Sequence, residues 1–177
     1  ALKIDEANEN KKSATLDHST LGYTYEKINK LDSASFHTDK AFQQRNFTPD
    51  YNHYLYQVMG NIQEKKGNYA KAASLFQEGL VLSEKRNDFL TASDICADFS
   101  ALYLKINNSD SAIFYALNGF KYGQQGSFKK GIMRSGMLLA ELYDSLQPAA
   151  ALSYYKIAVA AKDSLFGMDN IQTIQHL

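Results

Sequence analysis

Three kinds of residue are scarce in this 177-residue chain, which has one cysteine, two prolines and no tryptophan. A single cysteine excludes both a disulfide framework and a zinc site built from several thiolates. Only Pro49 and Pro148 can interrupt a helix. The apolar runs are far shorter than the roughly 18 residues that a transmembrane helix needs. The polar, acidic residues 1–10 do not have the pattern of a signal peptide.

Net charge is also missing, because 19 Lys and Arg residues balance 19 Asp and Glu residues. The chain therefore lacks the basic field that would hold nucleic acid or an anionic membrane surface. Hydrophobic residues make up 45% of the sequence and aromatic residues 12%, which is too apolar for intrinsic disorder. The length fits one ordinary domain or a short array of repeats.

Helical periodicity dominates the sequence, and strand signals are weak. In residues 69–84, for example, apolar residues recur at spacings of three and four. Thr48-Pro49-Asp50 is typical of a helix start, Lys65-Lys66-Gly67 of a helix end, and Asn68, Ser109 and Ser127 are candidate caps. Helices are predicted near 1–10, 15–28, 32–45, 49–66, 69–85, 89–106, 109–124, 128–145, 148–162 and 165–176. The short loops predict that neighbouring helices form antiparallel hairpins.

Small residues recur with a long period. Ala34, Ala72, Ala112 and Ala151 are 38, 40 and 39 residues apart. Seven residues after each of them stands another small residue, and twelve residues before the first three stand Gly22, Gly60 and Ser100. Two helices approach closely only where side chains are small, so these positions predict the helix crossings within each hairpin. Since one hairpin cannot bury its apolar faces alone, the hairpins are expected to stack on one another.

The pattern resembles the tetratricopeptide repeat (TPR) family. The matching residues are Leu21-Gly22, Tyr25, Ala34 and Ala41; Met59-Gly60, Gly67-Asn68-Tyr69, Ala72, Phe76 and Gly79; Phe99-Ser100, Tyr103, Ala112 and Gly119; and Leu139-Ala140, Tyr143, Ala151, Tyr155 and Ala158. The repeats here are 38–40 residues long, whereas the common unit of the family has 34. The resemblance implies an all-α fold, a right-handed superhelix (solenoid) of antiparallel helix hairpins with about four repeats and partial end helices.

The repeats divide residues 1–177, expected to be a single solenoid domain, into 15–45, 49–85, 89–124, 128–162 and two ends. Residues 1–12 match the tail helix of a preceding repeat, and residues 165–177 match the start of a further or capping helix. We therefore expect the chain to be a fragment of a longer protein. Its Ala-Lys-Asp-Ser-Leu-Phe segment, residues 161–166, resembles the TPR regions of Bacteroidetes signalling proteins. In those proteins a histidine kinase or a helix-turn-helix DNA-binding domain follows the repeats.

No combination of residues in the sequence predicts catalysis, a metal site or a cofactor. The four histidines lack ligand spacing, and His18 occupies a repeat position that predicts packing. Cys96 is predicted to be a buried small hydrophobe. Asp94 and Asp98 lie four residues apart, which is compatible with an acid–base pair, but a solvated acidic patch lining a groove is the favoured interpretation. The chain is predicted not to be an enzyme.

In the TPR family the first helix of each hairpin lines a concave, peptide-binding groove. By repeat register, the candidate groove residues are Tyr23, Tyr54, Gln57, Asn61, Asp94, Asp98, Arg134, Met137 and Glu141. The carboxylate clamp with which some members hold chaperone tails is not matched, because acids stand at Asp94 and Asp98 where cations are needed. The middle of the groove is therefore expected to favour a cationic or neutral peptide.

These observations predict a non-catalytic, protein- or peptide-binding sensor or interaction domain of a bacterial signal-transduction or transcription-regulatory protein. The alternative is a structural scaffold or adaptor for a multiprotein assembly, without regulatory output. No direct contact with nucleic acid is expected, and a homodimer could form through the open repeat ends, Ala1–Lys12 or Asp169–Leu177. The single cysteine is compatible with periplasm or cytoplasm, and the resemblance to membrane-tethered signalling proteins favours the periplasm.

Overall fold

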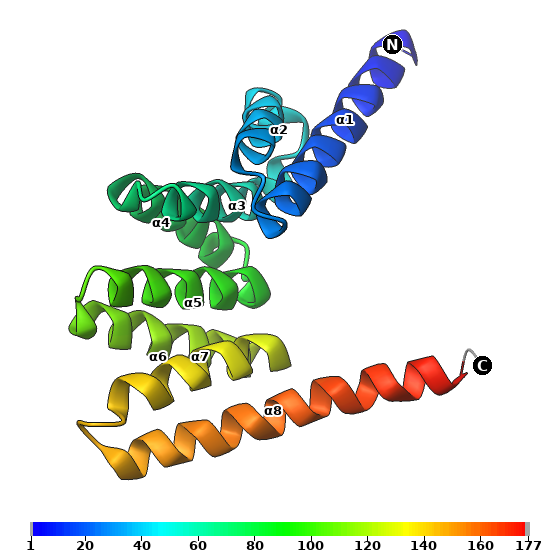
Figure 1. The fold of residues 1–177 in the computed structure, drawn as a ribbon. Helices are drawn as coiled ribbons and strands as arrows, with labels where there is room; N and C mark the ends of the chain where they lie inside the picture. Colours follow the sequence, from blue (N-terminus) through cyan, green and yellow to red (C-terminus); the bar gives the residue numbers. More distant parts are fainter. Residues whose placement is uncertain (1, 176–177) are drawn as a thin grey trace. The chain divides into compact units, whose positions relative to one another are not determined.

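The computed structural model describes the backbone of residues 2–175 and the side chains of residues 9–165 (Figure 1). Within these residues it contains eight α-helices, two short 3₁₀ helices and no strand. The helices are α1 (Leu2–Lys27), α2 (Leu31–Gln43), η1 (Arg45–Phe47), η2 (Pro49–Tyr51), α3 (Asn52–Lys65), α4 (Tyr69–Lys85), α5 (Phe89–Lys105), α6 (Ser109–Gln125), α7 (Lys129–Tyr143) and α8 (Pro148–Gln175). The prediction of an all-α fold is confirmed. None of the described helices is both long and apolar enough to cross a lipid bilayer.

The helix boundaries differ from the prediction at three places. One helix, α1, runs through residues 11–14, and α8 likewise runs through residues 163–164, where two helices each were predicted. Neither segment holds a proline or glycine that would stop a helix. At the third place, Pro49 begins a 3₁₀ turn and the α-helix starts only at Asn52. The proposed dimer contacts, Ala1–Lys12 and Asp169–Leu177, involve side chains that lie largely outside the described residues.

The chain forms two compact units, residues 1–82 and 83–177. In the first unit α1 packs on α2, α2 on α3, and α1 also touches α3. In the second unit α5 packs on α6, α6 on α7, α7 on α8, and α5 also touches α7. Consecutive helices therefore pair within each unit, as the short loops predicted.

Five helix ends share one kind of turn. Asn29, Gly67, Asn87, Asn107 and Ser127 all have positive φ, between 51° and 80°. The N–H of the residue after each donates to the carbonyl five positions earlier, for example Asn108 to Tyr103 at 2.9 Å and Phe128 to Gly123 at 2.7 Å. This pattern closes the end of a helix with a left-handed residue. From Gly67 to Ser127 the left-handed residues recur every 20 positions.

Two of the predicted helix caps were wrong. Asn108, and not Ser109, accepts a hydrogen bond from the Ser111 N–H at 3.1 Å. Ser127 does not cap α7, because its left-handed backbone ends the turn before that helix, whose N-cap position is Phe128. In the same structural position at α5, Asp88 accepts from the Thr91 N–H at 3.1 Å.

Small residues stand at the helix contacts, as predicted. A Cβ atom added to Gly22 would lie 2.5 Å from Thr38 Cγ2, and one added to Gly60 would overlap the Phe76 ring. Ala34 and Ala72 are fully buried. In the second unit, a Cβ on Gly119 would lie 2.6 Å from Ser135 Oγ. These glycines let the helices approach more closely than any larger side chain would allow.

Each unit has its own apolar core. In the first unit Ala34, Val58 and Ile62 are buried beneath three tyrosines. In the second unit the core joins α6 to α7, and its buried members are Ala112, Ala116, Phe120, Leu139 and Leu142. α7 therefore covers the face that α6 turns toward it.

Candidate functional site

The predicted groove residues of the first unit mainly pack against its core. Tyr23 and Tyr54 lie with ring centroids 5.9 Å apart and cover the buried Ala34–Val58–Ile62 cluster. Gln57 is buried and Asn61 is half-buried. Tyr23 and Tyr54 are therefore part of the packing over this core.

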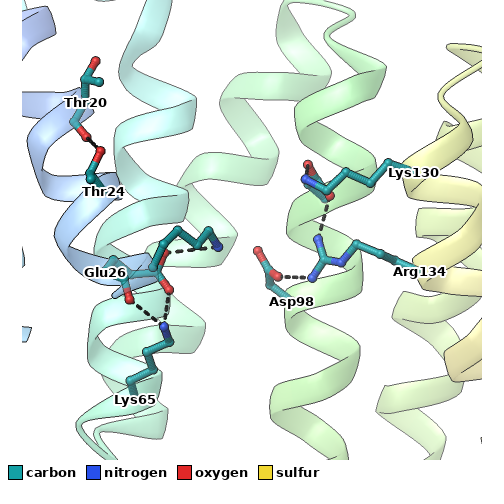
Figure 2. A network of polar contacts seen from close by, with 9 residues as sticks. Thr20, Thr24, Glu26, Lys65, Asp98, Lys130 and Arg134 are labelled. Carbon is teal, nitrogen blue, oxygen red and sulfur yellow. Dashed lines mark hydrogen bonds and ion pairs between the residues drawn. The ribbon is translucent and has the colours of Figure 1, made fainter. Parts of the chain in front are cut away.

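The groove residues of the second unit include a network of charges between α5 and α7 (Figure 2). Arg134 donates to Asp94 Oδ1 at 2.6 Å and to Asp98 Oδ1 at 2.5 Å, and the Lys130 ammonium lies 3.4 Å from Asp94 Oδ2. Burial opposes the charge on Arg134, but the carboxylates of Asp98 and Asp94 outweigh it and raise its pKa above the usual value. Arg134 stays charged at every pH that the fold survives.

This network removes the reason for expecting a cationic peptide at Asp94 and Asp98. The prediction treated both carboxylates as available to a ligand, whereas Arg134 and Lys130 of the same chain already pair with them. The residues are correctly placed on one face, but their charges are used to hold α7 on α5. Sequence register showed Arg134 at the groove without showing that its side chain turns back onto the preceding repeat.

The last two groove residues, Met137 and Glu141, line an open cleft of about 560 Å³ between α7 and α8. Its other lining residues are Ala140, Asp144, Pro148, Ala151, Leu152 and Tyr155. Leu152 is 54% exposed and Tyr155 50% exposed, so two large apolar side chains face solvent at this cleft. An exposed apolar surface with polar edges is typical of an interaction site.

Two carboxylates stand on the α7 side of this cleft. Glu141 lies in the last turn of α7 and Asp144 is the C-cap residue, and both side chains are exposed. Within residues 9–165 neither forms an ion pair, and the last turn of α7 contains no basic residue. The carbonyl end of a helix disfavours negative charge, so a cation brought to this rim would be stabilised.

Sequence analysis missed Asp144, Leu152 and Tyr155 as site residues. Tyr155 was identified only as a residue of the repeat pattern, at the position that Ala116 holds in the preceding repeat. Ala116 is fully buried whereas Tyr155 is half-exposed. The useful signal was the pair of acids that follow Met137, because side-chain size alone does not indicate exposure: Phe76 at the equivalent position of an earlier repeat is fully buried.

Two further clusters contain residues capable of chemistry. His18 Nδ1 lies 2.9 Å from His37 Nδ1, and the His37 ring stacks on Tyr25 with centroids 5.4 Å apart. His18 thus packs against the neighbouring helix. Cys96 is buried, and burial, aided by Glu84 and Asp98, raises the pKa of its thiol well above the usual range. The described residues contain no group of three or more His, Cys, Asp or Glu side chains placed to hold a metal ion.

Comparison with known proteins assigns no family to the chain. No protein-family model matches it, and no curated protein matches it significantly. The geometry of the second unit and the repeat pattern are therefore the basis for inferring a function.

Proposed function

We propose that this chain is a TPR-type interaction domain of a bacterial signalling or transcription-regulatory protein, and that it binds a protein partner without catalysis. The repeat of small residues and the pairing of consecutive helices support a right-handed solenoid of stacked hairpins. The observation that carries the proposed function is the cleft between α7 and α8, where Leu152 and Tyr155 are exposed beside two carboxylates.

Binding would use a surface that is already formed. The cleft is built on two packed helices, and one of its lining residues, Ala151, is buried. A partner that covers Leu152 and Tyr155 would remove their apolar surface from water. Few side chains of this chain would have to become ordered on binding. Occupation of this helix face would then be passed on by small shifts between adjacent helices.

The proposed function is tested by capture of the partner in cells and by gene expression. A photo-crosslinking phenylalanine analogue placed at Tyr155, which lines the cleft and is half-exposed, should trap a specific protein, and Leu152→Ser should abolish the product. Leu146→Ser is the matched control, since Leu146 is 63% exposed but does not line the cleft. Unchanged capture by Leu152→Ser would refute binding at the cleft.

A role in regulation is tested by a separate measurement of gene expression. If the domain belongs to a signalling protein, Leu152→Ser should change the transcript profile of the host cell as deletion of the whole domain does. A stable multiprotein complex without any change in transcription would instead support the scaffold alternative.

A further inference from the structure

The cleft between α7 and α8 is the counterpart of a surface that the second unit fills with one of its own helices. Repeat register places cleft residues Met137 and Ala140 40 positions after Ala97 and Ser100, and Ala151 and Tyr155 39 positions after Ala112 and Ala116. All four earlier residues are completely buried. Ala112 and Ala116 share their core with Leu139 and Leu142 of α7. The same face is thus covered by a helix in one repeat and, among the residues that the structure describes, open in the next.

The open face differs from the covered one in charge. Glu141 and Asp144 stand 40 positions after Ala101 and Leu104, so two carboxylates replace two apolar residues. Leu104 packs against the core that contains Leu139 and Leu142. A helix seated on the open face would therefore meet an apolar floor in which Met137 and Tyr155 replace two alanines, and an acidic edge that α7 does not meet.

We infer that the occupant of this cleft is an amphipathic helix of another protein, with small and aliphatic residues on one face and a Lys or Arg facing Glu141 and Asp144. This inference rests on the proposed function and specifies its partner. The covered face supplies the precedent for a helix as ligand. The precedent for charge is the α5–α7 contact, where Arg134 of the docked helix bridges the two carboxylates of the helix beneath it.

Register within the α5–α7 contact indicates where the cation must stand. The residues of α7 that pair with α5 lie 36 or 40 positions after their partners. Ala101 and Leu104 are the counterparts of Glu141 and Asp144 on the covered face. Adding 36 or 40 to their numbers gives residues 137–141 and 140–144 of a helix that docks as α7 does. Residues 140 and 141 fall in both ranges, and in α7 the charged one of the two is Glu141, which would oppose the acidic edge.

A pair of synthetic probes tests this inference directly. One is a fluorescein-labelled peptide with the sequence of residues 128–144, and the other is the same peptide carrying Glu141→Lys. Fluorescence anisotropy should show that the lysine probe binds the intact chain about fivefold more tightly at low salt, because two exposed charge pairs replace two repulsions. The difference should shrink as salt is raised.

Protein variants separate the apolar floor from the acidic edge. Leu152→Ser should weaken both probes about tenfold, since it removes a large side chain from the centre of the contact. Glu141→Gln with Asp144→Asn should abolish the preference for the lysine probe. Leu146→Ser should change neither affinity. Because all four residues are exposed, unchanged circular dichroism melting will show that each variant is folded.

Four results would overturn the inference. Equal binding of both probes would remove the charge argument, and equal effects of Leu152→Ser and Leu146→Ser would remove the cleft. A wild-type dimer in sedimentation that Leu152→Ser dissolves would identify the occupant as a second copy of this chain. If neither probe binds while Leu152→Ser still abolishes crosslinking to the cellular partner, the basic helix is wrong and the proposed function stands.

Discussion

Each of the two units contains an ion pair between helices that are not consecutive, and the charged residues that form it differ between the units. In each, an ion pair joins two helices that are separated in sequence by one other helix (Figure 2). In the first unit, the Lys65 ammonium on α3 lies 2.6 Å from Glu26 Oε1 on α1, and also donates to the Glu26 carbonyl at 2.7 Å. In the second unit, Arg134 on α7 bridges Asp94 and Asp98 on α5.

The difference lies in burial and in the number of partners. The Glu26 side chain is 2% exposed, whereas those of Asp94 and Asp98 are 12% and 11% exposed. Removing one partner from a buried pair leaves a charge that water cannot reach, and this costs more than the pair itself contributes. The deeper site in the first unit should therefore be the more sensitive one, although it has the simpler geometry.

Lys65→Met is expected to produce the largest effect, a loss of about 3 kcal/mol in the free energy of unfolding, because Glu26 stays buried without its main partner. Lys27, 3.2 Å from Glu26 Oε2, compensates only partly. Urea denaturation followed by circular dichroism measures the loss. In the Lys65→Met background, Glu26→Gln should recover stability, and a further loss there would contradict the argument.

Arg134→Met should destabilise the second unit by a smaller amount, about 1–2 kcal/mol. Its carboxylates are closer to water, and Lys130 remains near Asp94. Arg134→Lys is the control, since an ammonium cannot hold two carboxylates in the planar geometry of a guanidinium and should restore only part of the loss. A larger effect at Arg134 than at Lys65 would reverse the comparison between the units.

The left-handed turns provide a third comparison. Gly67→Ala in the first unit should cost about 1 kcal/mol through backbone conformation alone, because a Cβ there meets nothing within 4 Å. Ser127→Gly in the second unit should stabilise by up to about 1 kcal/mol for the same reason. Asn107→Gly is the control and should be nearly neutral, since asparagine tolerates this conformation. Thermal melts of the three variants would show whether the turns are equivalent.

The smallest effect is expected at an exposed pair of the first unit. The Lys66 ammonium lies 3.4 Å from Asp32 Oδ1, and Asp32 is fully exposed. Asp32→Asn should leave the melting temperature unchanged at physiological salt, because water and ions screen the pair. A measurable decrease would contradict the argument that burial decides how much an ion pair matters in these units.

The positions of the central helices could be predicted because spacing and turn residues agree there. The predicted helices 69–85, 89–106 and 109–124 match α4, α5 and α6 within one residue at each end. At residues 11–14 the prediction followed the repeat register, whereas the backbone followed local helix propensity and continued. Ser127 could not be assigned from sequence, because a serine before a helix is equally suited to a cap.

The site was predicted in part for a related reason. Register placed Met137 and Glu141 on an accessible face, and the structure puts them in the cleft. It could not show that Tyr155 is half-exposed while its counterpart Ala116 is buried, because periodicity identifies a packing position but not what covers it. Nor could it show which acids are neutralised inside the chain, since that depends on the rotamer of Arg134.

The turn that recurs every 20 positions also makes the length of the molecule adjustable. Residues 88–127 begin after one left-handed residue and end on another, Asn87 and Ser127. A tandem duplication of this 40-residue block would join Ser127 to a second Asp88, and both junctions would keep a turn that the chain already uses. Such a gene could gain a hairpin in a single recombination event, without inventing a new loop and without altering the cleft between α7 and α8.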